Sequence, residues 1–389
     1  MSGFFARGHL SVPEPDEIQA VVERVRLDTR AHVLDLGIGM YRNEAGDTHL
    51  FESVADAARA VLSQGHGRSY LAQQGDGTFL ELLGALVLQD LSNHCAALQT
   101  SGGTGAIRLA LELAKALNPT GAVHVGVPGW ANHVAIAQRL RLECRTFPYF
   151  DVAAQQICAQ AIELQDFRQG DIYILHGPCH NPTGADLSLD QCRSVVRQIN
   201  DKQGMLLIDT AYFGFGAGLQ EDLSRVRELV SLADCAAVAV SCSKAFGLYG
   251  DRTGALFVKG AQAQPAVQAV LQQYARHMTS SAPRFGSDVV SHLLADPTLS
   301  AAWRRELEAR RQHVQVLRHA VSKALTFWPD NNIADQSGIF SLLPLQEEQI
   351  LELGQQYAVH LPTSGRVNVT ALAENRIPQF VEALAQVVS

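Results

Sequence analysis

The sequence lacks several features that would point to other classes of protein. It has 31 lysines and arginines against 39 aspartates and glutamates, a formal net charge of −8, and no basic run. This charge argues against binding of nucleic acid, whose phosphates attract basic surfaces. No apolar run reaches the roughly 18 residues of a membrane helix, so we expect no membrane span. The N-terminus has no apolar core of adequate length, so we expect no signal peptide.

Cysteine is neither abundant nor regularly spaced. The seven cysteines are an odd number, and no Cys-x-x-Cys pair occurs. This usage predicts a reducing, cytoplasmic location. No His-x-x-x-His pair falls on one predicted helix. We therefore expect no metal site, and we expect His133, His176 and His180 to have hydrogen-bonded roles instead.

What is present is the composition of a large globular protein. With 389 residues, 47% of them hydrophobic, the chain can form a large core and two lobes. Five apolar runs are typical of strands buried on both faces, as in parallel sheets, and helical patterns lie between them. The alternation predicts an α/β fold with a mostly parallel sheet. The strands are expected at Val123–Val127, Ile172–His176, Met205–Asp209, Ala236–Ser241 and Gly254–Val258, and the helices at 104–118, Asn132–Leu142 and Leu189–Lys202.

The C-terminal part has a different pattern. A long charged helix is predicted over 300–324, followed by strands near 339–343 and 366–369 and by a final helix that Pro378 opens. This pattern predicts a smaller α+β lobe, onto which the N-terminal segment returns. We therefore predict a large domain at 37–309 and a small domain made of 1–36 and 310–389.

Polar side chains follow four of the predicted strands. Asp209 and Tyr212 follow one strand, Asn181 another, Trp130 a third and Lys244 a fourth. Ligands in open α/β sheets bind beyond the carboxyl ends of the strands, so we expect these side chains to meet there. In addition, the "SGGTG" segment at 101–105 opens a predicted helix, whose free amides suit a phosphate.

Together these groups predict one ligand. A phosphate suits the amides of Gly103 and Thr104, the Ser241 hydroxyl and Arg252. An aromatic ring would stack on Trp130, and a protonated ring nitrogen would pair with Asp209. A phenolic oxygen would accept from Asn181 and Tyr212, and a carbonyl would react with the amine of Lys244. Pyridoxal 5'-phosphate has all of these features. Each motif alone also fits a plain role: a tight turn, a helix cap, a core tryptophan or a solvated lysine. Their joint occurrence favours the cofactor.

Several longer motifs resemble a known family. They are "SGGTGAIR", "VPGWANH", "HGPCHNPTG", "DTAYFGFGAGLQED", "SKAFGLYGDRTGAL" and "SGRVNV". With them the chain resembles the fold-type I, class I aminotransferases that depend on pyridoxal phosphate, in particular the aspartate and aromatic amino acid aminotransferases. The resemblance runs from "LDLGIGMYRNEAG" to "SGRVNVTAL". It implies an aspartate aminotransferase-like fold, in which the large domain binds the cofactor.

The resemblance also implies roles for the matching residues. Lys244 matches the lysine that bonds to the cofactor and moves the proton, and Asp209 matches the partner of the ring nitrogen. His133 is similar to the residue that supports this aspartate. Arg366 matches the arginine that binds the substrate carboxylate, and the family implies a homodimer with shared sites. The other cofactor contacts fall on Gly103, Thr104, Trp130, Asn181, Tyr212, Ser241, Arg252 and, from the neighbouring subunit, Tyr70; further substrate contacts fall on Gly39, Trp130 and Asn181.

The substrate is less well defined by the sequence. Arg276, with Ser280 four residues on, resembles the arginine that binds a distal carboxylate from the other subunit, which would admit 2-oxoglutarate. The family's Asn-Pro-Pro is Ser281-Ala282-Pro283 here, and polar Gln19 stands where the aspartate enzymes have an apolar residue. We expect transfer of an amino group from aspartate, an aromatic or a related specialised L-amino acid to a 2-oxo acid. The alternative is an enzyme that uses the same cofactor for decarboxylation, β/γ-elimination or cyclisation. The third hypothesis is a regulator that binds the cofactor without catalysis.

Overall fold

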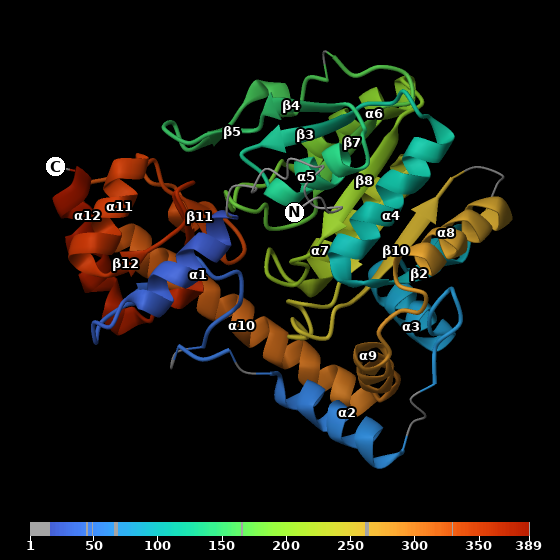
Figure 1. Cartoon of the computed structure of the whole chain (residues 1–389), viewed down its shortest axis with the longest axis horizontal. Coiled ribbons are helices and arrows are strands. Elements are labelled where there is room, and N and C mark those ends of the chain that lie inside the picture. Colours follow the sequence, from blue (N-terminus) through green and yellow to red (C-terminus); the bar gives the residue numbers. More distant parts are fainter. Residues whose placement is uncertain are drawn as a thin grey trace, which may run out of the picture.

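A seven-stranded sheet forms the centre of the molecule (Figure 1). The computed structural model describes residues 16–43, 46–48, 50–65, 69–164, 166–260, 264–328 and 330–388. The strand order is β2-β10-β9-β8-β7-β3-β4. The strands are β2 (Cys95–Ser101), β3 (Val123–Val127), β4 (Cys144–Pro148), β7 (Ile172–His176), β8 (Met205–Thr210), β9 (Ala236–Ser241) and β10 (Thr253–Lys259).

The sheet is mostly parallel, with one reversed strand. The neighbours from β9 through β8, β7 and β3 to β4 all pair in parallel. β10 pairs antiparallel with both β9 and β2. The interpretation of all five apolar runs as parallel strands is therefore wrong for β10. The reason lies in the connection from β9, because residues 242–252 form only turns and a parallel crossover needs a longer segment, usually a helix.

Helices cover both faces of this sheet. On one face, apolar residues of α4 (Gly102–Leu117), α5 (Ala131–Arg139) and α8 (Gln264–Met278) are buried against the strands. On the other face lie α2 (Glu52–Ser63), α3 (Gly77–Val87), α6 (Leu189–Asp201), α7 (Leu219–Leu232) and α9 (Phe285–Ala295). The large domain therefore has three layers, which agrees with the α/β fold predicted from the sequence. Within the described ranges, no helix is both long and apolar enough to cross a membrane.

The last part of the chain forms a separate cluster of buried residues together with the segment around β1 (Leu34–Asp35). β1 pairs in parallel with β12 (Val359–His360), and β11 (Phe340–Leu342) pairs antiparallel with β13 (Arg366–Asn368). Around them lie α1 (Glu17–Leu27), α11 (Glu347–Tyr357) and α12 (Ile377–Val388). Short strands β5 (Phe150–Asp151) and β6 (Gln156–Ile157) form one further pair.

One long helix joins the two clusters. α10 (Pro297–Ala324) runs from the C-terminal helices to α9 and α2 (Figure 1). It places Trp303 and Leu307 in the core beside the large sheet and Val321 in the core beside β12. The predicted division at residue 309 falls inside this helix. That division, with 1–36 joined to 310–389, stays a proposal.

Candidate active site

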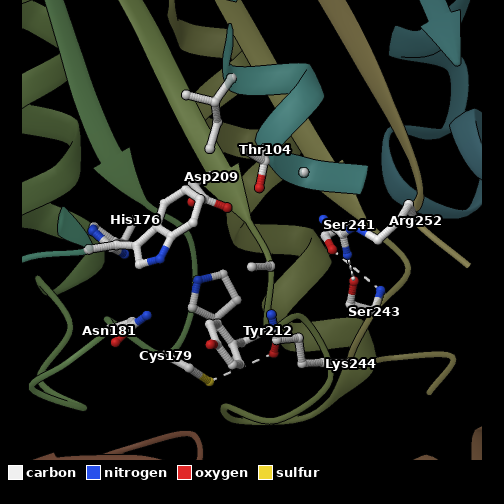
Figure 2. A pocket seen from close by; sticks show the side chains of 15 residues that line it. Thr104, His176, Cys179, Asn181, Asp209, Tyr212, Ser241, Ser243, Lys244 and Arg252 are labelled. Atoms are coloured by element: carbon white, nitrogen blue, oxygen red, sulfur yellow. Dashed lines mark hydrogen bonds between the residues drawn. The ribbon is translucent and has the colours of Figure 1, made fainter. Parts of the chain in front are cut away.

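A cavity lies where β7, β8 and β9 end and where α4 begins (Figure 2). Parallel strands bring their carboxyl ends to one edge of the sheet, and this sets the residues that follow them side by side. The cavity is lined by Gly103, Thr104, Ile107, Trp130, His176, Pro178, Cys179, Asn181, Asp209, Ala211, Tyr212, Ser241, Ser243, Lys244 and Arg252. Nine of these residues are among the cofactor contacts predicted from the sequence.

Asp209 lies near the end of β8, and its two carboxylate oxygens differ in their hydrogen bonding. Oδ2 accepts a hydrogen bond from His133 Nε2 at 3.0 Å, and this is the contact predicted for His133. Oδ1 is buried and has no partner in the described part of the chain. Burial acts to raise the pKa of Asp209, but the hydrogen bond from His133 and the positive charge of Lys244 oppose burial, and the net effect lowers that pKa. Asp209 is therefore an anion with one free oxygen.

Two more histidines stand behind this pair. The His133 and His176 rings are 4.9 Å apart, and those of His176 and His180 are 4.1 Å apart. Burial is the main cause that lowers the pKa of His176 to about 3 and that of His180 well below its ordinary value. Both rings are therefore neutral. His180 Nδ1 lies 2.9 Å from the Thr183 hydroxyl, so at least this ring has the hydrogen-bonded role expected for the histidines.

Lys244 lies three residues beyond β9, in the turn that leads toward β10. Its Nζ is 4.8 Å from the centre of the Tyr212 ring, and no hydrogen bond to it is found among the described residues. Burial lowers the pKa of Lys244 to about 8; Asp209 opposes this shift, and Arg252 and Arg366 add to it. A neutral amine is thus accessible near neutral pH, as a nucleophile or a base requires.

An anion site lies at the start of α4. Ser101 gives the helix no side-chain cap, so its first amides stay available for an anion. A Cβ on Gly102 would lie 2.7 Å from Arg252 Nη2, and one on Gly103 would lie 3.1 Å from the Ser241 Cβ. Glycine at both positions leaves room between these side chains. In Figure 2, Ser241, Ser243 and Arg252 gather on the side opposite His176 and Asn181.

Arg366, on β13, lies in a second cavity that adjoins the first. Trp130 and Asn181 line both cavities. The Arg366 guanidinium lies 4.3 Å from the centre of the Phe340 ring and donates to the Gly37 carbonyl at 2.6 Å and to Asn181 Oδ1 at 3.5 Å. Its Nε is buried without a partner among the described residues. One donor of this buried cation is therefore free for a ligand.

Three residues predicted for the site lie outside these cavities in the single chain. Tyr70 is 94% exposed. Arg276 is exposed on α8, where its Nη1 donates to the Ser280 hydroxyl at 2.9 Å. Gly39 precedes α2 in a segment without helix or strand, and a Cβ there would touch the Phe340 ring at 3.5 Å.

Sequence reasoning gave no site role to some residues that line the first cavity. Ser243 lies within the "SCSKAFG" stretch, and its hydroxyl accepts from Arg252 Nη1 at 3.4 Å. Cys179 reaches the cavity because its backbone has a φ of 70°, which turns the loop after β7. For Ser243, the available signal was its place in the sequence, between the predicted site residues Ser241 and Lys244. The turn at Cys179 had none, because cysteine does not mark a left-handed backbone.

Comparison with known proteins identifies the family. The family model for aminotransferase class I and II matches residues 31–384. The chain belongs to this family. A tyrosine aminotransferase of Rhizobium meliloti (strain 1021) is 37% identical over 365 residues, covering 92% of this chain and 94% of that protein. An aspartate aminotransferase of Salmonella typhi is 32% identical over 394 residues, which cover 97% of this chain and 99% of that protein.

A solved structure agrees in fold and carries the cofactor. The aromatic-amino-acid aminotransferase from Burkholderia pseudomallei, covalently bound to pyridoxal phosphate, matches with a TM-score of 0.93 at 30% identity over 100% of both chains. The predicted family, fold and aminotransferase activity are confirmed. The names of these relatives favour transamination over the decarboxylase, lyase and cyclase alternatives.

Pyridoxal phosphate is the cofactor of this aminotransferase, and the first cavity fits it. The unpartnered Asp209 oxygen suits a protonated ring nitrogen, and the glycine-lined start of α4 beside Arg252 suits a phosphate. Lys244 supplies an amine whose pKa is near neutral. The chemical roles of the individual residues stay predictions.

Proposed function

We propose that this aminotransferase moves the amino group of an aromatic or related L-amino acid to a 2-oxo acid such as 2-oxoglutarate, within amino acid metabolism or biosynthesis. The observation that carries the choice of substrate is the wall of the second cavity. Beside Arg366 this wall is largely apolar, formed by Val127, Val134, Ala135 and the Trp130 ring. Relatives named tyrosine and aromatic-amino-acid aminotransferases support the same choice.

The first cavity holds the cofactor in this proposal. Gly103, Thr104, Ser241 and Arg252 bind the phosphate, and Trp130 contacts the ring. When bound, pyridoxal phosphate supplies a reactive carbonyl and an electron-withdrawing ring. Asp209 accepts a hydrogen bond from the protonated ring nitrogen on its free Oδ1, while its Oδ2 accepts from His133.

Tyr212 and Asn181 donate hydrogen bonds to the phenolic oxygen. Burial raises the pKa of Tyr212, which keeps its hydroxyl protonated and able to donate. Lys244 takes the proton from the substrate α-carbon as a base and then, as an ammonium, delivers it to the other carbon bonded to the transferred nitrogen. A pKa near 8 matches that task, because the amine is then free in part of the molecules at neutral pH and the ammonium in the rest.

Arg366 binds the substrate α-carboxylate. The guanidinium is buried, contacts the Phe340 ring and donates a hydrogen bond to the Gly37 carbonyl. Burial acts to lower the pKa of Arg366 and so raises the benefit of an anionic partner. Binding at this point sets the α-carbon at the junction of the two cavities, next to Trp130 and Asn181.

The functional unit in this proposal is a homodimer with shared sites. Tyr70 and Arg276 are exposed and line neither cavity of their own chain, which supports roles in the partner's site. Tyr70 reaches the partner's cofactor phosphate, and Arg276 binds the distal carboxylate of 2-oxoglutarate. We also propose a cytoplasmic location, which rests on the seven free cysteines.

The experiment is a screen of half-reactions. Purified protein loaded with pyridoxal phosphate is mixed with one L-amino acid at a time, and the absorbance change to the amine form of the cofactor is followed. Aromatic amino acids should convert it fastest, and later addition of 2-oxoglutarate should restore the starting spectrum and give glutamate. Release of carbon dioxide or ammonia without conversion to the amine form would refute transamination. Lys244→Ala is the control, and it should abolish both the starting absorbance band and the conversion.

A further inference from the structure

The second cavity carries charges that the catalytic roles do not explain. It lies between α1, the turn from β3 into α5, and the turn at 362–366 that leads into β13. Its lining is mostly apolar, yet Asp16, Glu17 and Arg366 belong to it. Two anions and one cation therefore border the space that lies directly outside the cofactor cavity.

Glu17 is held in place at this wall. It is the first residue of α1, is half-buried, and its Oε2 accepts from the Ser364 amide at 3.3 Å. This bond joins α1 to the turn before Arg366. Asp16 precedes it as the helix cap, and its Oδ1 accepts from the amides of Ile18 and Gln19 at 3.0 and 3.2 Å.

The charges at this wall are not balanced once substrate is bound. Arg366 is 7% exposed and has an unpartnered Nε, which points to an anionic ligand as its counterpart. Glu17 and Asp16 are close enough to raise the pKa of Arg366, although burial remains the larger effect in the opposite direction. When an α-carboxylate neutralises the guanidinium, the two acidic side chains remain as the local charge.

We propose that Glu17, assisted by Asp16, determines which amino donor this enzyme accepts, favouring a ring that ends in a hydrogen-bond donor or a cation and disfavouring a side chain that ends in a carboxylate. The inference rests on the proposed function and makes its substrate class narrower. The apolar wall of Val127, Val134 and Ala135 contacts the body of the side chain. The carboxylate of Glu17 then attracts a hydrogen-bond donor or a cation at the end of the substrate side chain. It repels a carboxylate there, because two negative charges close together disfavour each other.

The test compares two variants of the same helix. Glu17→Gln removes the charge and keeps an oxygen for the Ser364 amide. Glu23→Gln removes a charge from the exposed face, where Glu23 pairs with Arg26 outside the cavity. Half-reaction kcat/KM is measured for aspartate, phenylalanine and tyrosine. For Glu17→Gln, the aspartate-to-phenylalanine ratio should rise about threefold to tenfold and the tyrosine-to-phenylalanine ratio should fall about threefold, while Glu23→Gln leaves both ratios unchanged.

Ligand binding gives a second readout that does not depend on turnover. Titration calorimetry of the holoenzyme with succinate and with 3-phenylpropionate should show that Glu17→Gln tightens succinate binding only, and less so at high ionic strength. Unchanged substrate ratios for Glu17→Gln would overturn the inference. An equal change in kcat/KM for every substrate would also overturn it, because it would mean that Glu17 only positions Arg366. Asp16→Asn with Glu17→Gln keeps the helix cap and should enlarge the effect. Failure of the proposed function is distinguishable, since wild-type enzyme would then convert no amino acid.

Discussion

His133 Nε2 lies 3.0 Å from one carboxylate oxygen of Asp209, and the other carboxylate oxygen is buried without a partner in the described chain. A second pair of the same kind exists away from the cavity, where His124 Nε2 lies 2.8 Å from Asp171 Oδ2 and Asp171 Oδ1 accepts from the Ala122 amide. The difference between the two pairs is the free oxygen. A structural pair uses both oxygens, whereas Asp209 keeps one for a ligand.

Replacing Asp209 by asparagine should therefore affect chemistry more than folding. Asp209→Asn keeps the size of the side chain but removes the negative charge that holds a proton on the ring nitrogen. We expect the half-reaction rate to fall by a factor on the order of 10² to 10⁴, while the phosphate site still retains the cofactor. Single-turnover absorbance measures the rate. Asp171→Asn is the matched control; it should lower the melting temperature and leave the rate within about threefold of wild type. Equal rate losses for both variants would contradict the assignment.

Lys244 should destabilise the cofactor-free protein. Its pKa in the folded chain, about 8, is below the ordinary value of 10.5, so between these pH values the unfolded chain binds more protons. The free energy of unfolding should therefore rise with pH from about 8 toward 10.5, and below 8 the whole cost is present. At about 1.4 kcal/mol per pKa unit the cost has an upper limit of roughly 3 to 4 kcal/mol, and solvent lowers it further because Lys244 is only half-buried.

The measurement is denaturant unfolding of cofactor-free Lys244→Met at several pH values. The variant should be more stable than wild type at pH 7, and this advantage should shrink as the pH approaches 10. Lys323→Met, a change at an exposed residue of α10, should give no such pH-dependent difference. A less stable Lys244→Met protein at pH 7 would contradict the prediction.

Much of the large domain could be predicted because its strands are almost wholly apolar. The bounds of β3, β7 and β9 match the predicted runs, since every residue of β9 and all but the last of β7 are buried, as in the interior of a sheet that is covered on both faces. The sequence predicts neither β2 nor β4, because β2 is buried only in part and no residue of β4 is fully buried, as expected for the outer strands of the sheet. The reversal of β10 depends on a connection without a helix, which an apolar pattern does not reveal.

The cofactor site was predictable for the same reason that the strands were. A residue that follows a buried parallel strand is placed at one edge of the sheet, so the strand pattern alone groups Asp209, Ser241 and Lys244. Glu17 could not be joined to them in this way. It lies more than 300 residues before Arg366, and contacts such as the pairing of β1 with β12 and the bond from the Ser364 amide bring the two together.

Arg366 should tolerate lysine poorly. The guanidinium lies over the Phe340 ring, and its separate donors reach the Gly37 carbonyl and Asn181 while Nε keeps one donor for a ligand. A lysine ammonium has no such plane, so Arg366→Lys should lower kcat/KM by about 10- to 100-fold, mainly through KM. Arg42→Lys, at an arginine paired with Asp35 outside the cavities, is the control and should change KM little. A large loss in kcat with an unchanged KM would argue against carboxylate binding by Arg366.

Arg276 should matter only for substrates with a second carboxylate. In the single chain its Nη1 contacts Ser280 at 2.9 Å and the side chain is exposed. If it serves the partner's site, Arg276→Leu should lower kcat/KM for 2-oxoglutarate and glutamate by about 10- to 100-fold and for phenylalanine by less than about threefold. Half-reaction kinetics with both classes of substrate check this, and equal losses would refute the role.

Mixed dimers decide whether Arg276 acts across the subunit interface. Neither Arg276→Leu nor Lys244→Ala homodimers should process glutamate well, because each lacks one group in both of its sites. A heterodimer of the two variants contains one site with Lys244 from one chain and Arg276 from the other, so it should recover up to half of the wild-type activity toward glutamate per dimer. The measurement uses differently tagged chains that are co-expressed and purified through both tags. If Arg276 acted within its own chain, the active lysine and the intact arginine would never share a site, and the heterodimer would have about half of the weak activity of the Arg276→Leu homodimer.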